Sequence, residues 1–532
     1  MRLPFRCAAN VPVLLRFLLF TPAYAGVAQS AEVEISPQEL IGKKIYYSGS
    51  AREKGDITAR LTNSDAVIPA MHLACANCHG ISGDGITEAG VRAPSITWQT
   101  LSRTAAPAGS ARSRGAYNDA SLEQAITHGI DSSGSLLHPG MPRYQISEAQ
   151  AAAVIAYLKI LGTSKDTDPG IGDTTIRLGT LLPQSGPFAA ISADIEAVLR
   201  AYFTQINNAG GIYGRRIELI VEDTGGKPDG VHAATRRLIE SHRVFAMVAS
   251  FDPGFSGSRH DALERSTVPV IGPVMLTPHV ATTPNRFVYY LLPSFYDQAR
   301  SLVDYISNSR VNPAQRLRLA VIHAEGDYEE AAAVGALAQG KLHGLEIIID
   351  QRYVTGQFPA RAMYDLLAAK QPDYILFFGP GQDLEALAKH MAQGELNIPV
   401  ATSTAMVGRA AFNMRSRFTQ QLLLVHPAAL PGKDDFSELA ILLGGPGNNP
   451  VFQALALGAA KIFVETAKRS GRRLNRAILV NTIEQLRDFK TGVAPPVSFG
   501  PGHHIGARSS YIVRIDTVSG QYIALTERLE PQ

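Results

Sequence analysis

The sequence predicts a two-lobed α/β domain preceded by a small all-α domain. Two observations support this prediction. From residue 174 onward, short β-branched or apolar runs alternate with helical stretches, a pattern typical of parallel sheets covered by helices on both faces. Before residue 164, the expected elements are helices separated by long loops. A chain of 532 residues is also too long for one compact core, so several domains are expected.

The composition is that of a folded protein without a nucleic-acid partner. Hydrophobic residues make up 45% of the chain and charged residues 18%, which argues against wholesale disorder. The net charge is only +3, and the lysines and arginines form no basic stripe. The turn ending in Gln382 lacks the Lys-Ser/Thr ending of a phosphate loop, and no G-x-S-x-G elbow is present. We therefore expect a protein that is not an enzyme.

The N-terminus has the pattern of an export signal. A basic start is followed by an apolar run over 11–20, and a small-x-small triplet ends at Ala25. We predict a signal peptide over 1–25 and a periplasmic location; cleavage after Ala31 and an uncleaved anchor are the alternatives. The apolar run is too short for about 30 Å of hydrocarbon, and we expect no transmembrane segment in the mature chain.

The first domain, over 26–163, is predicted to be mainly helical. A first helix is expected over 42–47 and a short amphipathic helix over 121–128. Ser147, with a glutamine three residues later, forms a capping box that opens a helix over 151–162. The apolar residues of this last helix are spaced for burial on one face.

A polar segment with proline and glycine, 164–173, is predicted to be a linker to the second domain, 174–532. The second domain ends in an expected hairpin over 511–525. Nine strands are expected before it, which is enough for two sheets and hence two lobes. They are the segments 175–182, 215–222, 244–250, 268–275, 286–292, 316–323, 345–350, 372–378 and 398–403.

The segment CANCH places two of the three cysteines of the chain, Cys75 and Cys78, directly before His79. Haem bound through thioethers needs two thiols on one helical turn and an imidazole beside them, and C-x-x-C-H supplies all three. Zinc would need further ligands, and the third cysteine would leave with the signal peptide. A disulfide would not need the histidine. The motif therefore favours one covalently bound haem c.

A second motif, LHPGMPRY, places Met141 in a proline-bounded loop just before the last helix. Together with CANCH, this arrangement resembles class I cytochrome c over about residues 38–162. The resemblance implies that Met141 is the second axial ligand opposite His79, and that the carbonyl of Pro94 fixes the axial imidazole. His72 and His138 remain rival sixth ligands, and Met141 is also compatible with a simple core role.

The same resemblance implies that the first and last helices cross. Gly42 and Tyr46 are expected to contact Tyr157 at this crossing. Methionine–histidine ligation raises the reduction potential relative to two imidazoles. Because both axial positions would be filled, the expected activity is one-electron transfer.

The second domain opens with IRLGTLLPQSGPFA over 176–189 and continues with NNAGGIYG over 207–214. This order of strand, Ser-Gly-Pro turn, helix and glycine-rich turn resembles the type I periplasmic solute-binding proteins. The nearest branch binds leucine, isoleucine, valine and amides for ABC importers. The resemblance implies a ligand held between two lobes that close by a hinge, and an ABC permease as partner.

The positions that hold a free amino acid in this family differ here. The hydroxyl-rich loop has no hydroxyl at 253–254, and the carboxylate-binding threonine is replaced by Leu276, with Thr277 next to it. The acidic position that holds the ammonium group falls near Thr404, whereas Tyr328 matches the family's ligand-stacking tyrosine. A free amino acid would bury both of its charges, and unpaired buried charges are costly.

We therefore expect a small organic solute that is not a free amino acid and that is uncharged or singly charged. Phe251, Leu276 and Tyr328 suit an aromatic molecule or an alcohol, and Asp252 offers a hydrogen-bond acceptor. The alternatives remain that Phe251 and Leu276 belong to the core and that Asp252 caps a helix.

Three functional hypotheses follow. The first is a periplasmic solute-binding protein with a fused one-electron haem domain. The second is an electron carrier for a periplasmic dehydrogenase, such as a quinoprotein, or for another cytochrome, with the binding domain acting in docking or substrate sensing. The third is ordinary ABC uptake in which the haem is incidental.

Overall fold

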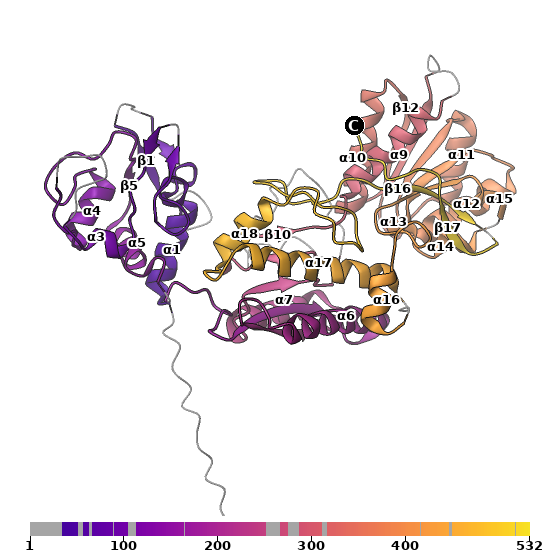
Figure 1. Cartoon of the computed structure of the whole chain (residues 1–532). Helices are drawn as coiled ribbons and strands as arrows, with labels where there is room; N and C mark the ends of the chain where they lie inside the picture. Colours follow the sequence, from indigo (N-terminus) through magenta and orange to yellow (C-terminus); the bar gives the residue numbers. More distant parts are fainter. Residues whose placement is uncertain are drawn as a thin grey trace, which may run out of the picture. The chain divides into compact units, whose positions relative to one another are not determined.

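The computed structural model (Figure 1) describes most of the chain after residue 34, and the predicted signal peptide lies outside the described residues. Residues 35–532 form one compact unit by their contacts. The described ranges are 35–51, 57–62, 66–88, 90–104, 113–163, 165–251, 266–274, 287–310, 316–414, 416–445, 449–516 and 518–532.

The N-terminal domain is built on helices, as predicted. The capping box of the last helix is present, because Ser147 accepts from the amide of Gln150, and a second capping box at Ser36 opens the first helix. The first helix begins earlier than 42–47 because a proline occupies its first turn. The helices are α1 (Pro37–Ser48), α2 (Cys75–His79), α3 (Trp98–Leu101), α4 (Asp119–Thr127) and α5 (Glu148–Ile160), with a 3₁₀ turn η1 (Ala70–His72) before α2.

Helices α1 and α5 cross at a glycine, which confirms the predicted contact. A Cβ atom at Gly42 would lie 1.9 Å from the carbonyl oxygen of Ala153 and 2.8 Å from the Cβ of Tyr157. Only the absence of a side chain lets the two backbones approach so closely. Tyr46 and Tyr157 are fully buried at this crossing, with ring centroids 5.6 Å apart.

Two small sheets accompany these helices, a feature that the all-α prediction did not include. Strand β1 (Thr58–Arg60) pairs antiparallel with β2 (Ile68–Pro69) on one side and with β5 (Arg143–Gln145) on the other. Strands β3 (Thr87–Glu88) and β4 (Val91–Arg92) form a short hairpin. Because β5 directly follows the loop of Met141, the first sheet fixes one end of that loop.

The first lobe of the C-terminal domain is a parallel sheet in the order β10-β9-β8-β6-β7. This order places the first strand beside the second and third, as in doubly wound folds. The strands are β6 (Thr175–Leu182), β7 (Arg216–Asp223), β8 (Ala246–Val248), β9 (Val270–Ile271) and β10 (Val288–Tyr289). The helical segments between them are η2 (Gly186–Phe188), α6 (Ala189–Asn208), α7 (Pro228–Arg236) and η3 (Arg237–Ser241).

The second lobe is a larger sheet in the order β12-β11-β13-β14-β15-β16-β17, whose last two strands are antiparallel. Its strands are β11 (Arg318–Ala324), β12 (Glu346–Tyr353), β13 (Tyr374–Phe378), β14 (Val400–Ser403), β15 (Leu422–His426), β16 (Tyr511–Asp516) and β17 (Gln521–Ala524). Its helices are α9 (Phe295–Asn308), α10 (Asp327–Leu342), α11 (Ala360–Lys370), α12 (Gly381–Gln393), α13 (Thr404–Val407), α14 (Ala410–Asn413) and α15 (Ser416–Thr419).

After β15 the chain returns to the first lobe before it finishes in the second. The apolar residues of α17 (Pro450–Arg469) and α18 (Arg476–Glu484) share the first-lobe core, and α16 (Ser437–Leu443) contacts α6. Figure 1 shows α17 running along the first lobe beside α6. The chain therefore connects the two lobes at more than one point, as a hinged two-lobed domain requires.

All nine predicted strands and the terminal hairpin are present, whereas β15 was not predicted. Within the described ranges, no helix is both long and apolar enough to cross a membrane.

Candidate functional site

The CANCH motif forms the short helix α2, which presents its two thiols and its imidazole from a single turn and a half. Cys75 and Cys78 are free thiols; Cys75 is half-buried and Cys78 is exposed. His79 is buried, with 6% of its surface exposed. The thiols are thus available for covalent attachment, while the imidazole is fixed in the protein.

The ring of His79 is oriented by the carbonyl of Pro94, which its Nδ1 contacts at 2.8 Å. An N–H at Nδ1 donates this bond, so the other ring nitrogen, Nε2, carries the free lone pair. Burial lowers the pKa of His79, which favours the neutral ring that a metal needs. Within the described residues, no hydrogen bond reaches Nε2.

The backbone that follows His79 is held by two tyrosines of α1. The hydroxyl of Tyr46 donates to the carbonyl of Gly80 at 2.6 Å, and that of Tyr47 donates to the carbonyl of Ile81 at 2.8 Å. Both residues come from the helix that crosses α5. The first helix therefore supports the histidine from the residues directly after it.

The loop of Met141 lies against the same apolar core as Cys75. Arg143 donates to the carbonyl of Met141, and Tyr144 donates to the carbonyl of Leu73, just before α2. These two bonds, together with β5, tie the methionine loop to the segment that leads into the CANCH helix. The arrangement places a thioether and an imidazole in one compact domain.

The two rival sixth ligands are both exposed, whereas Met141 is half-buried. The ring of His138 contacts the amide of Gly140 in its own loop at 3.1 Å, and His72 ends the 3₁₀ turn before α2. Neither takes part in the core that contains Met141. The choice of Met141 as distal ligand stays a prediction.

The donor set fits a haem. Two unpaired thiols, an imidazole with an oriented lone pair and a soft thioether are the groups that thioether-bound haem iron requires. Met71, Ile86 and Leu136 are large apolar residues with exposed side chains in the segments around these ligands. Such residues suit contact with a flat apolar group.

The predicted solute-binding residues are only partly within the described chain. Asp252, Leu276 and Thr277 lie outside the described residues. Tyr328 is half-buried at the start of α10, and its ring packs against Phe295 with centroids 5.3 Å apart. It follows the carboxyl end of β11, the edge at which such folds bind ligands.

Thr404 lies at the carboxyl end of β14, but its hydroxyl already has partners inside the second lobe. It is 3.2 Å from the carbonyl of Val425 and 3.1 Å from Nδ1 of His426. His426 is buried, and this burial lowers its pKa to about 4. The position predicted to correspond to the acidic residue of amino-acid binders is therefore occupied by a neutral pair.

Phe251 is buried and belongs to an aromatic cluster of the first lobe. Its ring lies 5.7 Å from that of Phe188 and 5.7 Å from that of Phe452, both in edge-on geometry. Phe188 and Phe251 follow the carboxyl ends of β6 and β8, and Phe452 is on α17. Sequence reasoning missed Phe188, although it stands in the Ser-Gly-Pro-Phe turn, and missed His426, which no motif marks.

The fold and the two sites define a class: a two-lobed binding domain joined to a small domain built around C-x-x-C-H. Residues 175–521 match the family model described as "Periplasmic binding protein", and residues 70–162 match "Cytochrome c". The chain belongs to the periplasmic binding protein family and carries a cytochrome c domain, which implies covalently bound haem c.

Curated relatives named as binding proteins match part of this chain. "Leu/Ile/Val-binding protein homolog 7" of Brucella abortus (strain 2308) is 26% identical over 183 residues, covering 34% of this chain and 45% of that protein. "Amino acid binding protein" of Pseudomonas aeruginosa is 22% identical over 216 residues, covering 41% and 57%. This chain thus spans about half the length of the curated relatives it matches.

Solved structures of substrate-binding proteins match about two thirds of this chain and nearly all of their own chains. A "Fatty acid ABC transporter substrate-binding protein" from Thermomonospora curvata has a TM-score of 0.55 at 20% identity, covering 69% of this chain and 95% of that one. A branched-chain amino acid ABC transporter protein from Thermus thermophilus with bound valine has a TM-score of 0.52 at 16% identity, covering 68% and 97%. At these identities the likeness concerns the fold.

Proposed function

We propose that this protein is a periplasmic haem c protein that captures a small organic solute between its two lobes and transfers single electrons through its cytochrome domain. The observation that carries the haem assignment is the contact of His79 Nδ1 with the Pro94 carbonyl at 2.8 Å, next to two free thiols on one short helix. The solute assignment rests on the two-lobed fold and on membership of the binding-protein family.

Each residue of the haem site has one task. Cys75 and Cys78 tether the haem through thioether bonds, and His79 offers its Nε2 lone pair to the iron. Met141 would supply a thioether sulfur to the iron. When bound, the haem supplies a one-electron couple, and methionine ligation gives it a higher potential than a second imidazole would.

The solute is an organic molecule with at most one charge and is not a free amino acid. The acidic group that would pair with an ammonium is absent at Thr404, whose hydroxyl is engaged with Val425 and His426. At the carboxyl ends of the first-lobe strands stand Phe188 and Phe251. The half-buried ring of Phe188, packed on the buried Phe251, would suit an apolar or aromatic solute better than a zwitterion.

Two partners follow from this proposal. A solute-binding protein of this family delivers its ligand to an ABC permease, and a haem with both axial positions filled exchanges electrons with a periplasmic dehydrogenase or cytochrome. If the protein acts only as an electron carrier, the binding domain serves in docking or sensing. In that case no solute is retained in the cleft.

The haem assignment is tested by making the protein in cells competent for cytochrome maturation. We expect a reduced α-band and a mass increase of one porphyrin, both lost together in a Cys75→Ala/Cys78→Ala variant. A Met141→Ala variant should keep the haem but lose the sulfur-to-iron charge-transfer band of the ferric state. Protein without added porphyrin mass would overturn the redox part of the proposal.

The solute assignment is tested separately by native mass spectrometry of gently purified holoprotein. We expect a bound small molecule that is released on denaturation, and a lower retained fraction in Tyr328→Ala than in a matched surface change, Tyr213→Ala. An empty cleft together with rapid reduction by one dehydrogenase would favour the electron-carrier function. Retention of a free amino acid would contradict the proposed solute class.

A further inference from the structure

The segment predicted as a linker carries contacts along nearly its whole described length, 165–173. Lys165 donates to Glu39 at 2.7 Å, and the buried Ile171 pairs with Ile176 as a β-bridge. Arg215 donates to the carbonyl of Gly172 at 2.9 Å. A flexible tether would leave these groups in solvent, so this segment has a defined conformation.

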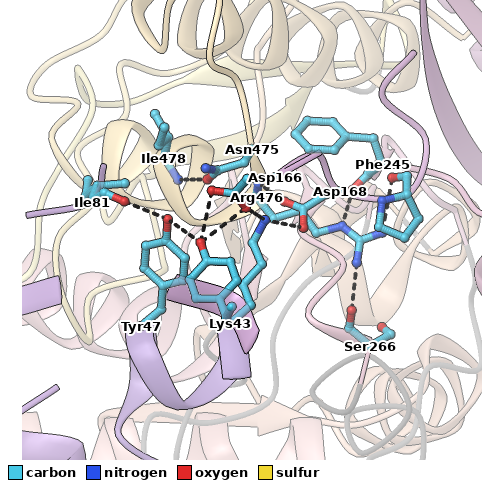
Figure 2. A network of polar contacts seen from close by, with 12 residues as sticks. Lys43, Tyr47, Ile81, Asp166, Asp168, Phe245, Ser266, Asn475, Arg476 and Ile478 are labelled. Atoms are coloured by element: carbon cyan, nitrogen blue, oxygen red, sulfur yellow. Dashed lines mark hydrogen bonds and ion pairs between the residues drawn. The ribbon is translucent and has the colours of Figure 1, made fainter. Parts of the chain in front are cut away.

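A buried ion cluster lies at the centre of this segment (Figure 2). Nζ of Lys43, on α1, is 2.9 Å from Asp166 and 3.0 Å from Asp168. The side chain of Lys43 is 8% exposed, and those of the two aspartates are each 5% exposed. At this depth, removing one partner leaves an uncompensated charge, unlike at an exposed ion pair.

Arg476 continues the cluster from the start of α18. Its amide donates to the carboxylate of Asp168, and its guanidinium donates to the carbonyls of Val244, Phe245 and Ser266 at 2.8, 3.0 and 2.8 Å. Val244 and Phe245 directly precede β8, and Ser266 lies shortly before β9, in the first lobe. Arg476 therefore fastens Asp168 to the first-lobe sheet.

The charges of the cluster balance, with two cations and two carboxylates. Burial alone would lower the pKa of Lys43, but the carboxylates of Asp168 and Asp166 raise it above its usual value. Burial would raise the pKa of Asp168, whereas Lys43 and Arg476 bring it below its usual value. Lys43 and Asp168 thus stay charged together near neutral pH.

The cluster also reaches the backbone of the CANCH region. The hydroxyl of Tyr157 donates to Asp166 at 3.1 Å, and Tyr157 lies beside Tyr47, whose hydroxyl holds the carbonyl of Ile81. The cluster is therefore continuous with the α1–α5 crossing that supports His79.

We propose that Lys43, Asp166, Asp168 and Arg476 form a fixed joint that fastens the haem domain to the first lobe, so that these two parts move as one body. The hinge of the binding domain then moves the second lobe alone. The joint fixes the position of the haem domain relative to the first lobe. It goes beyond the proposed function because it requires no particular solute or redox partner.

Hydrogen exchange on the full-length holoprotein tests the joint directly. In the wild type we expect slow exchange of the bonded amides of Ile171, Gly172 and Arg476. Lys43→Met keeps the length of the side chain but removes the charge, and should speed their exchange at least tenfold. Lys159→Met is the matched control, because Lys159 makes an exposed ion pair with Asp119 in the same domain.

If Lys43→Met does not fold, Asp168→Asn serves as the second variant. The asparagine side chain keeps an oxygen that accepts from the Arg476 N–H, but Lys43 loses one of its two carboxylate partners. We therefore expect a smaller acceleration of hydrogen exchange than in Lys43→Met. Equal exchange in the wild type and in every foldable joint variant would overturn the proposal.

Distance measurements test whether the two parts move together. Gln124 on α4 and Gln205 on α6 are exposed and can be changed to cysteine for gadolinium spin labels. The wild type should give one narrow distance distribution, Lys43→Met a broad one, and Lys159→Met the wild-type one. A broad distribution in the wild type would overturn the joint.

The labelling itself separates this test from the haem proposal. If Cys75 and Cys78 form thioethers, only two labels attach, and mass spectrometry counts them. Four labels would show that haem attachment has failed, without bearing on the joint. The hydrogen-exchange result then decides the joint alone.

Discussion

The proposed haem site and the proposed solute site of this chain are built in opposite ways. The first takes three of its four proposed haem-binding residues from five consecutive residues, Cys75 to His79, on one short helix. The second is spread over segments that follow separate strands, such as those of Phe251, Tyr328 and Thr404. A site built on one helical turn can be predicted from the sequence, because its residues are neighbours in the chain. A site assembled from distant segments depends on the conformation of each segment in the fold.

The largest effect is expected when both cysteines of the CANCH motif are replaced. Cys75→Ala/Cys78→Ala should abolish covalent haem completely, because the third cysteine, Cys7, stands in no C-x-x-C-H motif. The binding domain should still fold and keep its cooperative unfolding transition. Denaturing mass spectrometry and circular dichroism together measure both outcomes, and loss of the binding fold would contradict the independence of the two sites.

Two glycine substitutions, one in the haem domain and one in the binding domain, compare the stabilities of the two domains. Gly42→Ala would place a Cβ 1.9 Å from the Ala153 carbonyl, and we expect the haem domain to lose about 3 kcal/mol of unfolding free energy. Gly335→Ala is the matched change in the second lobe, where the Cβ would lie 2.4 Å from the Tyr296 carbonyl.

Denaturant titration followed at the Soret band and in the far ultraviolet separates the two transitions. Each change should shift only the transition of its own domain. If Gly42→Ala left the Soret transition in place, the close helix crossing would be wrong.

The second lobe should respond to acid through His426. Its folded-state pKa of about 4 lies below the usual 6.5, so the unfolded chain binds more protons between these values. Stability from this group is present above pH 6.5 and is lost as the pH falls toward 4. Between pH 7.5 and 4.5 we expect a loss of about 2 kcal/mol from this residue.

The measurement is the difference between wild type and His426→Gln in urea unfolding at the two pH values, because other groups titrate in both proteins. Arg528 and Asp434 also act on His426 and are unchanged in the variant. An identical pH dependence in both proteins would show that the ring is not buried in its neutral form.

The smallest effect is expected at the protein surface. Lys159→Met removes an ion pair with Asp119 whose side chains are 38% and 65% exposed. Exposed ion pairs contribute little to folding stability, and we expect the free energy of unfolding to change by less than about 0.5 kcal/mol in either domain. A loss comparable with that of Gly42→Ala would mean that this pair is far less solvated than its exposure indicates.

Local patterns predicted much of the fold. The strand β6 matches its predicted limits, and the capping box at Ser147 begins α5 where expected, because both depend on neighbouring residues. β15 was missed because a short apolar run such as Leu422–His426 is not distinguishable from a buried helical turn by periodicity. The two small sheets of the haem domain were missed because their strands are only two or three residues long.

The contacts that were not predicted are those that join distant parts of the chain. Lys43 lies 123 residues from Asp166, and Asp168 lies 308 residues from Arg476. Nothing in the sequence of 164–173 indicates such partners, since a polar segment with proline and glycine is typical of a flexible linker. The same holds for Thr404, whose hydroxyl is engaged by His426 from the neighbouring strand.

The pairing of β5 with β1 has a consequence for how easily the proposed sulfur ligand is displaced. Residues 143–145 are in register with 58–60, and Tyr144 is additionally bonded to the carbonyl of Leu73. For Met141 to swing outward and admit hydroxide or a foreign amine, part of this sheet would have to open. Local opening of this kind costs the bonds it breaks, so the pairing of β1 with β5 would oppose displacement of Met141 under alkaline stress.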